Sequence, residues 1–189
     1  MTAPRRQTMG RITGGIVLAG AAFLAPTGSA SAVTTTVAAT TWVTDDTDLL
    51  EVASTNGKAE ITPATIVWQH EGGIQVYEDA RAAWQARLRV DGGPNSCAYL
   101  KVTTYMKDNN GNESISKLFP AKGTEPHGYF HVCKDDGKGS NLFTGADVID
   151  NHLGGAPHHF SRVVAEVCYA KDLQSVGFAC AKITKHPGD

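Results

Sequence analysis

Three histidines lie close together in the chain and are the first candidates for a chemical site. His152, His158 and His159 fall within one short segment, and Asp147 and Asp150 come just before them. Imidazole and carboxylate groups are common zinc ligands in hydrolases. Adjacent histidines point apart on an extended chain, however, and the spacing does not match a His-Glu-x-x-His helix. Solvated loop histidines are therefore the favoured interpretation, and a small metal-dependent hydrolase is the less favoured alternative.

Other groups that could support catalysis lack the pattern that their chemistry needs. The segments 108–113 (DNNGNE) and 135–137 (DDG) supply oxygen ligands, but neither continues into a calcium loop. The chain has seven histidines that could act as a base, but it has no Gly-x-Ser-x-Gly segment to supply a nucleophilic serine. Paired carboxylates for glycoside hydrolysis depend on the fold and have no signature here. We therefore expect no enzymatic activity, no bound metal and no cofactor.

Three tyrosines are candidates for a binding face. Tyr99 and Tyr105 share one face of a predicted strand, and Tyr129 falls on the corresponding face of another. Their rings could stack on sugars or contact a protein. The alternative is that they cover a second sheet.

One loop could act as a protease-inhibiting segment. Lys171, Asp172 and Leu173 lie between Cys168 and Cys180, so a disulfide between these cysteines would hold the loop at its base. A rigid loop of this kind is what an inhibitor presents to a protease. An extracellular protease inhibitor is therefore an alternative to a general binding module.

The pattern of residues 162–184 predicts a disulfide-linked β-hairpin. If Cys168 lies opposite Cys180, Glu166 faces Lys182 on a mixed face that also carries one valine, and the other face of the ribbon is entirely apolar. Cysteines paired in this way lie within the Cα separation that a disulfide tolerates. The remaining two cysteines, Cys97 and Cys133, then form the second bridge. A zinc site is disfavoured because no Cys-x-x-Cys spacing is present.

Most of the remaining chain reads as short strands separated by turns. Clear alternation predicts a strand over 97–107, and Asn110-Gly111 predicts a type I′ hairpin that sets Met106 against Ile115. Further strands are expected at 65–69, 74–77, 83–90 and 127–133, with Pro63 at an edge or bulge. The segment 135–145 reads as a loop and 146–153 as a helical turn. Seven to nine strands of this kind indicate an antiparallel, immunoglobulin-like β-sandwich with two disulfides.

The first 32 residues have the features of a signal peptide: arginines, a short apolar run and Ala30-Ser31-Ala32 as a cleavage site. Residues 33–58 then read as a flexible Thr/Ala-rich arm, with a strand near Trp42 as the alternative, and 59–189 as the sandwich domain. The leader holds three of the 17 basic residues and none of the 19 acidic ones, so the mature chain would carry a net charge of −5. With no Lys/Arg cluster, nucleic acid is not an expected partner.

The segment 83–185 resembles a group of small exported β-proteins of high-GC Gram-positive bacteria. The resemblance lies in the last strands, which run from Val167-Cys168 through a short polar loop to Cys180-Ala-Lys182. It implies secretion and a disulfide-bonded sandwich, and brings no assigned activity. We expect a secreted, monomeric, non-enzymatic module that binds an extracellular protein or polysaccharide and does not remain in the membrane after the leader is removed.

Overall fold

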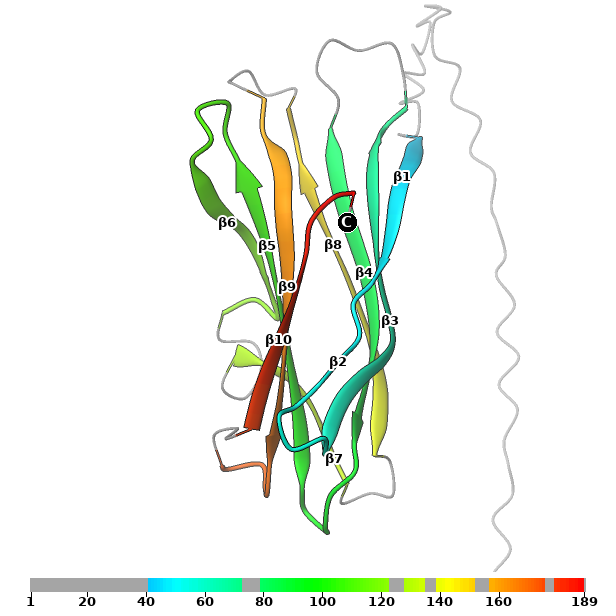
Figure 1. The fold of residues 1–189 in the computed structure, drawn as a ribbon, viewed down its shortest axis with the longest axis vertical. Coiled ribbons are helices and arrows are strands. Elements are labelled where there is room, and N and C mark those ends of the chain that lie inside the picture. The colour runs from blue at the N-terminus through cyan, green and yellow to red at the C-terminus, as the bar shows by residue number, and fades with distance from the viewer. Residues whose placement is uncertain are drawn as a thin grey trace, which may run out of the picture. The chain divides into compact units, whose positions relative to one another are not determined.

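Two antiparallel sheets packed face to face form the domain (Figure 1). The computed structural model describes residues 41–72, 79–122, 128–134, 139–151, 157–175 and 179–188. Within these ranges it contains ten strands and no helix, and hence no helix long and apolar enough to cross a membrane. The predicted all-β sandwich is confirmed.

Sheet A has the strand order β1-β3-β4-β8, with the short β2 pairing beside β1 on β3. Its members are β1 (Trp42–Leu49), β2 (Val52–Ala53), β3 (Ala59–Glu71), β4 (Ala80–Val90) and β8 (Ser140–Ile149). The pairing of β3 with β4 shifts register between Ile61 and Ala64, so Pro63 lies at an irregularity where its missing N–H is tolerated.

Sheet B has the order β10-β9-β5-β6, and β7 pairs with the first half of β5. Its members are β5 (Cys97–Lys107), β6 (Glu113–Phe119), β7 (Phe130–Cys133), β9 (His159–Ala170) and β10 (Ala179–Lys185). The predicted bounds of β5 are confirmed. Its strict alternation of apolar and polar residues left one face for the core and one for the outside.

The core lies between the sheets and is built from alternate residues of each central strand. In β4 the inward side chains are Ala82, Trp84, Ala86 and Leu88, which settles the segment 83–90 as a strand despite its helix-favouring composition. Trp84 contacts two aromatic residues of sheet B, with ring centroids 5.5 Å from Phe119 and 6.1 Å from Phe130. The two sheets are therefore joined by apolar packing between their inner faces, together with a buried hydrogen bond from Thr104 of β5 to Asp147 of β8.

The C-terminal hairpin has the predicted register. Cys168 pairs with Cys180, Glu166 with Lys182 and Ala165 with Ile183. Both predicted disulfides are present, Cys97–Cys133 and Cys168–Cys180. Each joins neighbouring antiparallel strands on the outer face of sheet B, so the two bridges clamp β7 and β10 to the centre of that sheet.

The turn between β5 and β6 differs from the predicted type I′ hairpin. Gly111 has a positive φ of 81° and Asn110 does not, whereas a type I′ turn needs both. The Asp108 carboxylate accepts hydrogen bonds from the N–H groups of Asn110 and Asn112, which builds a longer loop. A register shift follows between Thr104 and Tyr105, so Met106 pairs with Ser114 and not with Ile115.

Two further predictions about elements were wrong. Residues 140–149 form β8 and not a loop followed by a helical turn, because pairing with β4 supplies the hydrogen bonds that a short segment cannot make alone. Residues 52–53 form β2 and are not part of a flexible arm, and residues 42–49 form β1, which agrees with the alternative of a strand near Trp42. The leader and the predicted strand at 74–77 lie outside the described residues.

Gly145 is required because Trp84, its partner in the β4–β8 register, occupies the space above it. A Cβ on Gly145 would lie 2.7 Å from the indole atoms of Trp84. We expect Gly145→Ala to lower the free energy of unfolding by about 2 kcal/mol through overpacking, measured by urea denaturation. Gly93→Ala is the control, because nothing lies within 4 Å of a Cβ there. Equal stability of the two variants would contradict this account.

Candidate functional site

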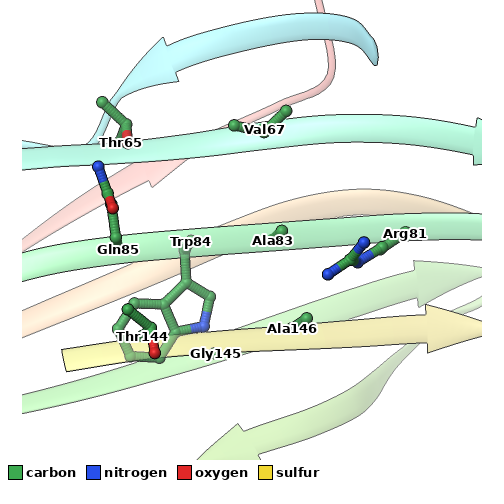
Figure 2. Close-up of a pocket in the computed structure, with 9 residues that line it drawn as sticks. All are labelled: Thr65, Val67, Arg81, Ala83, Trp84, Gln85, Thr144, Gly145 and Ala146. Carbon is green, nitrogen blue, oxygen red and sulfur yellow. The ribbon is translucent and has the colours of Figure 1, made fainter. Parts of the chain in front are cut away.

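A hollow of about 520 Å³ lies on the outer face of sheet A, over β3, β4 and β8 (Figure 2). Its floor consists of small residues at neighbouring positions, Ala83 on β4 and Gly145 and Ala146 on β8. Ala83 pairs directly with Ala146, so no large outward side chain stands in this row of the sheet. The hollow thus follows from the pairing of two strands that are 63 residues apart in the chain.

Polar side chains surround this floor. Thr65 on β3, Gln85 on β4 and Thr144 on β8 form one row across the sheet, because Gln85 pairs with both threonines. Arg81 stands on the other side, with its guanidinium carbon 5.5 Å from the centroid of the Trp42 ring. The rim therefore offers an amide, two hydroxyls and a cation, and none of the nine lining residues is a carboxylate or an imidazole.

Exposed apolar residues continue the outer face of sheet A beyond the hollow. Leu49 on β1 is 62% exposed, and Leu142 and Val148 on β8 are each 46% exposed. On β4, Arg87 and Arg89 follow Arg81 and Gln85 on the same face, and Arg89 lies 3.8 Å from the Glu60 carboxylate. This combination of apolar and basic side chains is typical of a surface that binds a partner.

The predicted tyrosine face is covered at its centre. Tyr99 is only 2% exposed, and its ring packs against Tyr129 with centroids 6.2 Å apart. The Tyr129 hydroxyl donates to Glu166 at 3.2 Å, and the Arg162 guanidinium lies 4.2 Å from the Tyr105 ring centroid. All three tyrosines lie on the outer side of sheet B, yet Tyr99 cannot contact a ligand in this arrangement.

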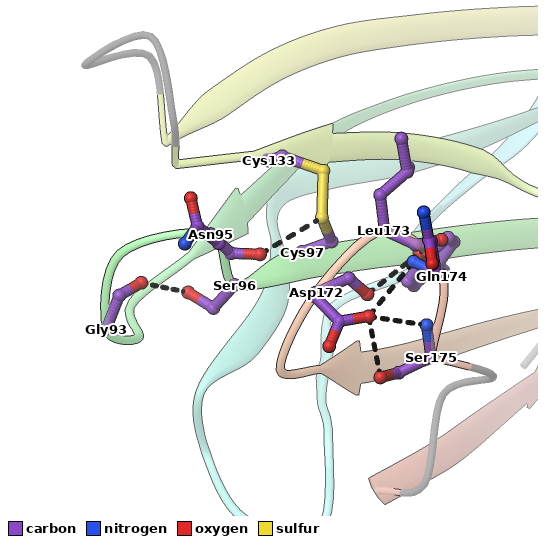
Figure 3. The surroundings of a disulfide bond; sticks show 10 residues. Gly93, Asn95, Ser96, Cys97, Cys133, Asp172, Leu173, Gln174 and Ser175 are labelled. Atoms are coloured by element: carbon purple, nitrogen blue, oxygen red, sulfur yellow. Dashed lines mark hydrogen bonds between the residues drawn. A yellow bond between two sulfur atoms is a disulfide. The ribbon is translucent and has the colours of Figure 1, made fainter.

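The loop that follows β9 covers Tyr99. The Tyr99 hydroxyl donates a hydrogen bond to the Leu173 carbonyl at 3.0 Å, and burial raises the pKa of Tyr99, helped by the nearby Asp172 charge. The Asp172 carboxylate in turn accepts from the N–H groups of Gln174 and Ser175 and from the Ser175 hydroxyl (Figure 3). This turn is therefore held by hydrogen bonds among its own residues and by the hydrogen bond from the Tyr99 hydroxyl of sheet B.

The residues predicted to form an inhibitory segment belong to this turn. Lys171, Asp172 and Leu173 are exposed, as an inhibitor requires, and Leu173 is 42% exposed. A protease takes its target segment in extended form with backbone groups free to pair. Here the carbonyls of Asp172 and Leu173 point to Tyr99, and Asp172 folds back on Ser175. The hollow on sheet A is therefore the better candidate site.

Of the three histidines considered as a less favoured metal site, His158 and His159 belong to the described residues. His152 lies outside them, His159 begins β9 as an exposed residue, and the backbone of His158 is bonded to the Asn151 side chain. In the described ranges, the one group of three close ligand atoms is Glu166, Cys168 and Cys180. Its sulfurs are joined in a disulfide, so they have no lone thiolate to offer a metal.

Sequence reasoning missed the residues of the hollow. The alternation of Arg81, Ala83 and Gln85 with buried residues showed which side chains of β4 point outward. Nothing in the sequence showed that β8 is a strand or that Ala146 lies beside Ala83. Small residues such as these carry no chemical signal by themselves.

We expect Tyr99→Phe to loosen the loop after β9 because its hydroxyl bonds to the Leu173 carbonyl. Loss of this bond should cost about 1 kcal/mol and speed hydrogen exchange at the Gln174 and Ser175 amides. Tyr105→Phe serves as the control, since it removes a hydroxyl from the same sheet face away from the loop. Unchanged exchange in Tyr99→Phe would show that the loop does not depend on this anchor.

Acid should open the same turn. Hydrogen bonds from Ser175 and Gln174 lower the pKa of Asp172 from its ordinary value. The carboxylate therefore stabilises the turn above the unfolded-state pKa, and this contribution is lost as the pH falls through the lower folded value. The Ser175 amide shift, followed by NMR, should report a midpoint below the ordinary pKa of an aspartate, and Asp172→Ala should abolish the transition. A midpoint above the ordinary value would contradict the assignment.

Comparison of this chain with protein-family models, with curated proteins and with solved structures finds no match. The chemistry of the hollow and of its rim is therefore what points to a function.

Proposed function

We propose that this protein is an exported, non-enzymatic binding module that holds a segment of an extracellular polysaccharide on the outer face of sheet A. The observation that carries the proposal is the hollow of about 520 Å³ with a floor of small residues and a polar rim. That volume lies in the range of small-ligand sites. A flat, open floor admits a sugar ring without any change in the sheet.

The rim has the groups that recognise hydroxyls. Gln85 can donate and accept at once, Thr65 and Thr144 offer hydroxyls on either side of it, and Arg81 offers several donors. Trp42 lies beside Arg81 at the end of the hollow, where an aromatic ring can pack against the apolar face of a sugar. Arg81 would favour a glycan that carries carboxylates.

Binding without catalysis fits the same set of residues. Hydrolysis of a glycosidic bond uses two carboxyl groups on opposite sides of the sugar. The nine residues that line the hollow are threonine, valine, arginine, alanine, tryptophan, glutamine and glycine, and none of these exchanges a proton near neutral pH. These side chains can hold a sugar and have no group with which to cleave it.

Export is supported by the chain itself. The first 32 residues have the features of a signal peptide, and all four cysteines are joined in disulfides. Such bridges persist in oxidising compartments outside the cytoplasm. Extracellular polysaccharides are therefore among the molecules that the protein would meet.

Titration of the mature protein with soluble polysaccharides tests this function, with neutral xylan and acidic polygalacturonate as probes and Trp fluorescence as the signal. We expect Gln85→Ala, and Ala83→Leu, which fills the hollow, to weaken binding by about tenfold, equivalent to about 1.4 kcal/mol. Arg81→Gln should weaken polygalacturonate more than xylan.

The matched control is Thr184→Ala, an exposed change on the outer face of sheet B. Its affinity should equal that of the unchanged protein. No binding of either polysaccharide, or equal losses in the control and the three variants, would refute the proposal.

A further inference from the structure

The edge strands of the two sheets differ in how they are protected against pairing with other chains. An exposed edge offers unpaired backbone groups, and charged side chains or bulges normally block it. On β1, the exposed Asp45, the partly exposed Asp46 and a register shift do so. On β10 Lys182 and Lys185 have this role, and on β6 Glu113 and Lys117. The strand β8 has one charged residue, Asp147, which is 5% exposed and accepts a hydrogen bond from Thr104 in the core.

Alternate residues of β8 direct their backbone groups to the outer edge of sheet A, which no strand of the described ranges pairs with and which is called the open edge below. Gly139, just before the strand, accepts a hydrogen bond from Val90 of β4 at 2.8 Å, so odd-numbered residues face β4. Successive residues of a strand point their N–H and C=O groups to opposite sides. Leu142, Thr144, Ala146 and Val148 therefore present theirs outward, where Lys117 reaches the Ala146 carbonyl at 3.1 Å.

The open edge is complementary to itself. If two β8 strands run antiparallel with Gly145 on the two-fold axis, Leu142 lies opposite Val148 of the other copy, and Thr144 opposite Ala146. All four are edge-facing residues, so each pair can exchange two backbone hydrogen bonds. Leu142 and Val148, each 46% exposed, would cover one another twice by symmetry.

Charge also favours this register. Ser140 would lie opposite Asp150 of the other copy, and on its own sheet Ser140 pairs with Arg89. Two strand spacings, about 10 Å, separate that aspartate from Arg89, which lies 3.8 Å from the Glu60 carboxylate of its own sheet, so charges of opposite sign approach at this end of the paired strands. The arrangement brings no two like charges opposite one another on β8, because its outward residues are uncharged.

We propose that β8 pairs with β8 of a second copy of this chain, about an axis through Gly145, and joins the two A sheets into one continuous sheet. This replaces the monomer expected from the sequence and does not rest on the polysaccharide proposal. It does place the two hollows beside the axis, since Thr144, Gly145 and Ala146 line each one. The site on each copy would then continue into that of its partner.

Lys117 opposes pairing at this edge, because it is bonded to one of the backbone groups that a second strand would use. Its ammonium group must leave the Ala146 carbonyl before pairing, and the Leu142 N–H must leave the Asn141 side chain. A ten-residue edge also buries less area than a standard stable interface. The dimer is therefore weak and depends on protein concentration. Lys117→Ala should raise the dimerisation affinity by about tenfold. The change frees one carbonyl on each copy, and each hydrogen bond gained at these carbonyls raises the affinity severalfold.

Cysteine cross-linking tests the register. Thr144→Cys and Ala146→Cys, mixed under mild oxidation, should give a disulfide-linked dimer, because directly opposed residues have Cα atoms about 5.5 Å apart. Thr144→Cys mixed with Leu142→Cys should not, since these positions are not opposed. Linkage in the second mixture and not in the first would overturn the register.

Sedimentation velocity over a range of concentrations tests the association itself. Thr144→Pro should keep the monomer folded, because its N–H faces the open edge, and should abolish the dimer. Ile115→Thr is the matched control, since it removes an apolar residue that is 53% exposed from a different edge strand. The unchanged protein and this control should dimerise equally. Monomers at every concentration in the unchanged protein and in Lys117→Ala, or dimers of unchanged strength in Thr144→Pro, would refute the proposal.

Discussion

The packing of Trp84 over Gly145 is the contact on which the rest of sheet A depends. The indole of Trp84 is 3% exposed and fills the space that a side chain on its partner Gly145 would occupy. It also contacts Phe119 and Phe130 of sheet B. One residue therefore links two strands and two layers. Among the described residues its indole N–H has no hydrogen-bond partner, a cost that its apolar contacts must outweigh.

The two outer faces of the sandwich have different physical characters. On sheet B, both disulfides and the loop anchored on Tyr99 cover the centre of the sheet, and ion pairs such as Arg162–Glu113 at 2.8 Å lie around it. On sheet A the centre is open and consists of small residues. Cross-links stabilise the outer face of sheet B, while the outer face of sheet A relies on the core beneath it for its shape.

This difference explains why binding is assigned to sheet A. The hollow lies over β3 and β4, which are paired on both sides, and over β8, which β4 holds along its whole length, so a ligand does not have to order the site first. The open edge of β8 adjoins that site through Thr144 and Ala146. Ligand binding and pairing of two copies would thus use neighbouring atoms of one strand, its side chains for the first and its backbone for the second.

The sequence by itself determined the elements whose signals are local. Strict alternation defined β5, the spacing of Cys168 and Cys180 fixed the hairpin register, and the remaining cysteines gave the second disulfide. The tertiary structure alone decided that 140–149 is a strand, because its mixed composition has no period and only the β4 ladder holds it extended. It also decided the hollow, since the closeness of Ala83 and Ala146 is a property of strand order, which no short-range pattern encodes.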